Sequence, residues 1–61
     1  MDIPIQYQTA SGRQYEMTIV LIEDKMSGDY VNAIVLHQPI NADHARDALQ
    51  AAADGLRKLG Y

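Results

Sequence analysis

The feature that most constrains this chain is a pair of alternating segments joined by Ala10-Ser11-Gly12. Before this tripeptide, Ile3, Ile5 and Tyr7 alternate with Pro4 and glutamines, and after it residues 13–23 alternate again. A period of two is typical of a strand with one buried face. A loop of this length with glycine at its end predicts a hairpin, with Gly12 in the left-handed conformation of a bulge.

This loop also predicts a register. It places Tyr7 opposite Tyr15, Ile5 opposite Met17 and Ile3 opposite Ile19, so that apolar side chains meet across the two strands. A slip by one residue would set apolar against polar side chains along the whole hairpin. Because Pro4 has no N–H to donate, the first strand is expected at a sheet edge.

A third strand is predicted over residues 30–38, after a polar turn that we expect to span residues 25–28. With that turn, Tyr30, Ile34 and Leu36 share the face of Met17, Ile19 and Leu21. Residues 33–36 are apolar on both faces, so the hydrophobic pattern by itself does not decide this register.

The last third of the chain predicts a helix that begins after Asn41, a favourable N-cap, and ends at Gly60, a favourable C-terminal cap. An apolar stripe with helical spacing faces the core, and Leu49 and Leu56 are expected to be buried there. The stripe consists of Ala42, Ala45, Leu49, Ala52, Leu56 and Leu59.

These elements predict an α+β fold: a three-stranded antiparallel meander (β-β-β) followed by one C-terminal helix packed on one sheet face. A chain of 61 residues allows one domain, residues 1–61. The chain has no cysteine, so disulfides do not add to its stability, and a core this small benefits from oligomerisation.

The second sheet face is not polar, although no helix is left to cover it. We expect it to carry five aliphatic side chains, a patch of roughly several hundred Å², which is large for the surface of a monomer. These predicted interface residues are Val20, Ile22, Val31, Ala33 and Val35. They predict a homodimer, or docking on a larger protein. The alternative is a short or bulged third strand whose face is partly covered by a terminus.

No motif indicates an enzyme, and no catalytic residue is predicted. Ser27, His37 and Asp29 lack the surroundings of a nucleophile elbow. His37 and His44, with Asp43 and Asp47, lack a fixed third ligand, so we predict neither a metal site nor a cofactor.

The net charge of −3 and the scattered basic residues argue against nucleic acid as the partner. No apolar run approaches the roughly 20 residues of a membrane span, and no signal peptide is evident, so the cytoplasm is the expected location. The sequence therefore predicts a non-enzymatic protein-interaction module of the adaptor or inhibitor type, including the phage-encoded kind, that dimerises through its open sheet face. The alternatives are a sheet-type nucleic-acid-binding regulator and a small accessory subunit or ligand carrier.

Overall fold

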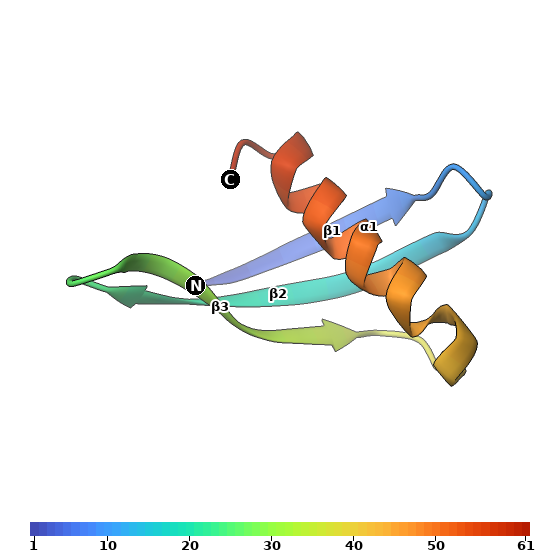
Figure 1. The fold of residues 1–61 in the computed structure, drawn as a ribbon, viewed down its shortest axis with the longest axis horizontal. Coiled ribbons are helices and arrows are strands. Elements are labelled where there is room, and N and C mark those ends of the chain that lie inside the picture. Colours follow the sequence, from blue (N-terminus) through green and yellow to red (C-terminus); the bar gives the residue numbers. More distant parts are fainter.

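The computed structural model describes all residues from Met1 to Tyr61 and contains one sheet and one long helix (Figure 1). The strands are β1 (Asp2–Gln8), β2 (Gln14–Asp24) and β3 (Gly28–Leu36), antiparallel in the order β1-β2-β3. A 3₁₀ turn, η1 (Ala42–His44), continues into α1 (Ala45–Lys58). The predicted α+β meander with a C-terminal helix on the sheet is confirmed. Neither helical segment combines the length and the apolar character needed to cross a membrane.

The first hairpin has the predicted register. Tyr7 pairs with Tyr15, Ile5 with Met17 and Ile3 with Ile19. Gly12 has a φ of 88°, the left-handed region that favours glycine, and its N–H donates to the Thr9 carbonyl oxygen at 2.9 Å. Turn chemistry and hydrophobic pattern therefore agree on the same structure.

The second hairpin departs from the prediction near its turn. Asp24 pairs directly with Gly28, so the turn is one residue shorter than expected, with Gly28 at a φ of 86°. Further along, Val20 pairs with Ala33 as expected. Asn32 lies between these two registers without a partner, and this bulge absorbs the difference of one residue.

The predicted faces of two side chains near this bulge are wrong. Val31 pairs with Leu21, so it lies on the helix-covered face and not beside Val20. Tyr30 pairs with Ile22 and takes the opposite face, where the sequence had placed Val31. The reason is the short turn, which shifts this part of β3 by one residue and so exchanges its two faces.

The helix crosses the strands at a steep angle, with its first turns beside the C-terminal end of β3, and its main contacts are with β1 and β2 (Figure 1). Most of β3 lies outside these contacts, and only Leu36 at its end packs against the core. Its contact surface consists of small residues: Ala48, Ala51, Ala52 and Gly55 are all buried. The prediction that Leu49 is buried is wrong, since it is 58% exposed. Leu56, also expected to be buried, is partly buried and packs against the core. Small side chains let the helix axis approach the sheet, and Leu49 and Leu59 are left exposed.

Nine residues form the core, and none of them belongs to β3. They are Ile3, Ile5, Tyr15, Met17, Ile19, Leu21, Ala48, Ala51 and Ala52. The Tyr15 hydroxyl donates to the Asp47 carboxylate at 2.9 Å, which ties the first turn of α1 to β2. The expected side-chain cap from Asn41 is absent.

The predicted cap at Gly60 is present and takes the form of a Schellman motif. Gly60 has a φ of 94° and donates to the Arg57 carbonyl oxygen at 3.0 Å. Tyr61 donates to the Leu56 carbonyl oxygen at 3.1 Å. The turn returns Tyr61 toward Leu56, where both side chains line the same cavity.

Candidate functional site

The apolar surface of this protein is concentrated around β3. No residue of this strand is buried, and from Tyr30 to Leu36 it carries no charged residue and no proline. The other edge strand, β1, contains Pro4, which removes one donor from that edge. A long, uncharged and apolar edge strand is a site of association unless it is covered.

The first apolar surface, here called the open face, lies on the side of the sheet away from α1. It consists of Val20, Ile22, Tyr30, Ala33 and Val35. The exposed fractions are 38% for Ile22, 46% for Tyr30 and 48% for Val35. The structure thus brings together four of the five predicted interface residues and replaces Val31 by Tyr30. That these residues form an interface stays a prediction.

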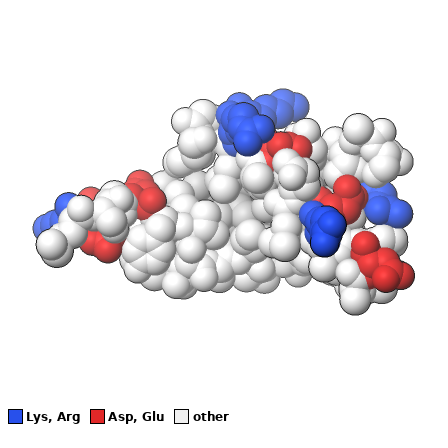
Figure 2. Space-filling view, viewed as in Figure 1, with Lys and Arg blue, Asp and Glu red and all other residues white.

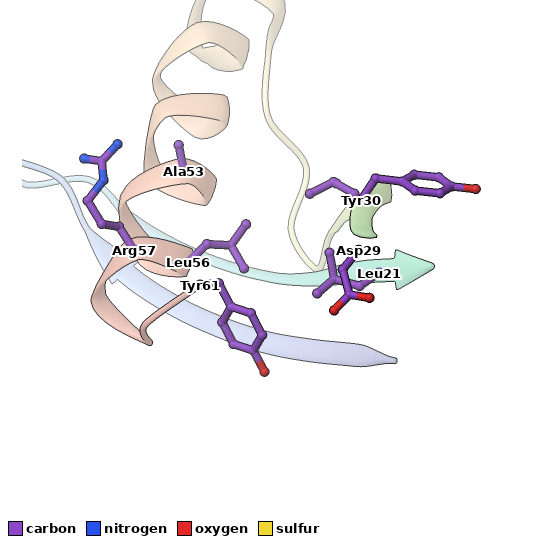
Figure 3. A pocket seen from close by; sticks show the side chains of 8 residues that line it. Leu21, Asp29, Tyr30, Ala53, Leu56, Arg57 and Tyr61 are labelled. Atoms are coloured by element: carbon purple, nitrogen blue, oxygen red, sulfur yellow. The ribbon is translucent and has the colours of Figure 1, made fainter. Parts of the chain in front are cut away.

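The second apolar surface, here called the groove, lies between α1 and β3 and was not predicted. Its cavity of about 410 Å³ is lined by Leu21 and Val31 from the sheet, by Ala53 and Leu56 from α1, and by Tyr61 (Figure 3). Asp29 and Arg57 also line it, whereas the ring of Tyr30 points away from Leu56. The groove could have been predicted from sequence only by predicting the bulge in β3, because this bulge turns Val31 to the groove side of the sheet.

The accessible surface of the molecule is larger than that expected for a compact monomer of its mass. A monomer of 6.8 kDa is expected to expose about 4,000 Å² and this one exposes 4523 Å². The radius of gyration is 12.0 Å, whereas about 10.5 Å is expected for this length. The excess comes from an arm, residues 21–31, in which β2 and β3 extend past the end of β1 (Figure 1).

Charged side chains gather at the two ends of the molecule and along α1, and a broad band below α1 carries none (Figure 2). Arg57 pairs with Asp54 at 3.3 Å and Arg13 with Asp47 at 3.6 Å. In the arm, Glu23 and Asp29 are direct cross-strand partners, and neither takes part in an ion pair.

Two groups have perturbed pKa values, and both have structural causes. Burial raises the pKa of Tyr15, and the hydrogen bond to Asp47 raises it further. Hydrogen bonds from the Met26 N–H and the Ser27 hydroxyl lower the pKa of Asp24. Both groups act within the fold: one attaches α1 to the sheet, and the other orders the turn of the arm.

The residues considered for catalysis or metal binding are not brought together. His37 forms a hydrogen bond with Thr18 at 2.8 Å, whereas Asp47 accepts from Tyr15. Ser27 donates to Asp24 in the turn of the arm, and His37 follows the far end of β3. No group of three or more His, Cys, Asp or Glu lies close enough to hold a metal ion. Comparison with protein families, with curated proteins and with solved structures finds no match to this chain.

Proposed function

We propose that this protein is a non-enzymatic interaction module that binds a second copy of itself through the open face. The observation that carries the proposal is the uncovered row of aliphatic and aromatic side chains on that face. These side chains lie next to an edge strand that has no charged residue and no proline from Tyr30 to Leu36. Two sheets that pack face to face bury their inner side chains in a layer about 10 Å thick. Such a dimer supplies the burial that β3 lacks in the single chain.

The size of the exposed surface supports the same proposal. The excess over a compact monomer is about 500 Å² and comes from the arm, which carries Ile22 and Tyr30 of the open face. Stacking the open faces leaves both helices on the outside. The outward side of α1 carries Arg46, Gln50 and Arg57, which therefore stay in water.

The same face is also suited to a different, larger protein, so an adaptor or inhibitor role belongs to this proposal. Nucleic acid is the less favoured partner, because the open face carries no lysine or arginine to contact phosphates. The role of an accessory subunit or ligand carrier has no separate observation in its favour.

The test is a charge on the open face. Val35→Lys would bury an unpaired ammonium in the dimer, at a cost of about several kcal/mol, whereas in a monomer the charge stays in water. The matched control is Gln6→Lys, at an exposed position on the same side of the sheet but on β1. Molar mass by light scattering over a concentration series, with circular dichroism for the fold, distinguishes the states.

We expect the wild type and Gln6→Lys to be dimers and Val35→Lys to be a folded monomer. A wild type that stays monomeric at high concentration, with Val35→Lys also folded, refutes the homodimer and leaves the face to another protein. A monomeric wild type that Val35→Lys unfolds would show that this face is internal. Salt-dependent binding to DNA or RNA would favour the nucleic-acid alternative.

A further inference from the structure

We propose that β3 pairs edge to edge with β3 of a second copy, so that two three-stranded sheets join into one sheet of six antiparallel strands. This contact uses backbone groups at the outer edge of β3, whereas the open face uses side chains on one side of the sheet. The edge contact therefore does not rest on the proposed stacking of open faces.

The outer edge of β3 carries unpaired backbone groups. In an antiparallel pair, the N–H and C=O of one residue point to the neighbouring strand, and those of the next residue point away from it. His37 donates its N–H to the Glu16 carbonyl oxygen at 3.0 Å. By this alternation the backbone groups of Ile34 and Leu36 point outward. β3 is the last strand of the sheet, and no hydrogen bond from a turn or loop reaches these two residues (Figure 1).

Two other free stretches of backbone in this sheet are protected. On the outer edge of β1, Pro4 occupies a position whose N–H would point outward. Beyond the end of β3, the Gln38 side chain accepts the Glu16 N–H at 3.0 Å and donates to the Gln14 carbonyl oxygen at 3.2 Å, which closes the edge of β2. β3 lacks such protection, because from Tyr30 to Leu36 it carries neither a proline nor a charged residue to prevent edge pairing.

A second copy is the proposed occupant because the sequence of β3 is complementary to itself. When Ile34 lies opposite Leu36 of the second copy, and Leu36 opposite its Ile34, each pair exchanges both of its outward backbone hydrogen bonds. Val35 then meets Val35 of the second copy on the open face, so apolar side chains are paired on both faces of the joined sheet. The central residue of a two-fold contact faces its own copy, where a charge would be repelled, and Val35 carries none.

The edge contact is short, so we expect it to be weaker than the open-face contact. The bulge at Asn32 interrupts the regular edge, and β3 ends at Leu36. We expect dimers at low concentration and tetramers as the concentration rises, since a chain with two different two-fold contacts joins four copies. Val35→Lys also places a charge on this edge, so it should remove both contacts and remain a monomer.

The test is the exchange rate of individual backbone amides in the wild-type chain, measured by NMR over a concentration series. An amide that exchanges only from the unpaired form slows about tenfold when about nine-tenths of the chains are paired. We expect this slowing at Ile34 and Leu36. The matched controls are Gln6 and Gln8, whose amides point outward on β1, and their exchange should not depend on concentration.

Modified chains separate the edge from the open face. A synthetic chain with an N-methyl group on the Ile34 amide loses the outward N–H but keeps every side chain. Its edge pairing should weaken at least about tenfold, which corresponds to about 1.4 kcal/mol. The same modification at Gln6 is the matched control and should leave the assembly unchanged. Val20→Lys, on the open face but on β2, should leave the slowing at Ile34 and Leu36 in place.

Three results would overturn the proposal. The first is exchange at Ile34 and Leu36 that stays constant up to the highest soluble concentration, which would leave this edge to an extended segment of a different protein. The second is equal slowing at Gln6 and Gln8, which would indicate a general effect and not pairing at β3. The third is loss of the slowing in a folded Val20→Lys chain, which would assign it to stacking of the open faces.

Discussion

Gly55 is the position where α1 approaches β1 too closely for a side chain. A Cβ atom at this position would lie 2.6 Å from Cγ2 of Ile5 and 3.4 Å from its Cδ1. Ile5 is only 3% exposed and is branched at Cβ, so its Cγ2 has little freedom to move. Gly55→Ala therefore introduces a contact that the packed core must absorb.

Two opposing effects determine the result of Gly55→Ala. Replacing glycine by alanine inside a helix favours the helix by about 1 kcal/mol. Overpacking a core costs about 1–3 kcal/mol. We expect the clash to prevail, with a net loss of about 1 kcal/mol, which lowers the Tm of a domain this small by about 4–8 °C.

The assay is urea unfolding followed by circular dichroism. Ala53→Gly, at an exposed position on the same helix, measures the helix propensity alone and should cost about 1 kcal/mol. Ile5→Leu removes the Cβ branch that carries Cγ2, so Gly55→Ala in that background should become neutral or stabilising. If Gly55→Ala stabilises the wild type by the full propensity term, the close approach of α1 to β1 is wrong.

Three further predictions concern the arm, the helix side and the bulge. Asp24→Ala should be less stable than the wild type at neutral pH. The lowered pKa of Asp24 means that this stabilisation is present above its usual value of 3.8 and lost as the pH falls through the folded-state value, so the difference in Tm should close in acid. Leu49→Ala should change stability by less than about 1 kcal/mol because the side chain is mostly exposed, and a loss of about 2–5 kcal/mol would show that it is buried. Deleting Asn32 should leave the fold intact, because Val31 and its neighbours then pair in one continuous register; unfolding on deletion would refute the bulge.

The parts of the fold that sequence predicts well are those where two independent signals agree. In the first hairpin, the glycine of the loop and the alternation of both strands select the same register. At the end of the helix, Gly60 marks the cap that the structure contains. In each case a local backbone requirement and a side-chain pattern lead to one answer.

The second hairpin lacked such agreement. Both the expected turn and the observed one end near Gly28, and the apolar run after it is compatible with either register. The structure uses the shorter turn, in which the Asp24 carboxylate accepts the Met26 N–H at 2.9 Å, and compensates with a bulge. A bulge leaves no strong mark in a single sequence, so the displacement of Val31 was not foreseen.

The rotation of the helix was mispredicted for a different reason. Sequence patterns rank leucine above alanine as a core residue, and the leucines of α1 do form a stripe with helical spacing. The alanines and Gly55 form another, and this second stripe allows the closer approach to β1. Close packing of backbone against backbone therefore prevails over burial of the larger side chains in this chain.

The two mispredictions have a common consequence. The bulge in β3 turns Val31 to the helix-covered face of the sheet, and the rotation of α1 leaves Leu49 outside the core. Each change leaves one apolar side chain largely exposed: Val31 is 44% exposed and Leu49 is 58% exposed, and of the two only Val31 lines the groove. A sequence selected only for the stability of the single chain would place polar residues at these positions, because they contribute little to its core. Their apolar character supports the proposal that this protein is an interaction module.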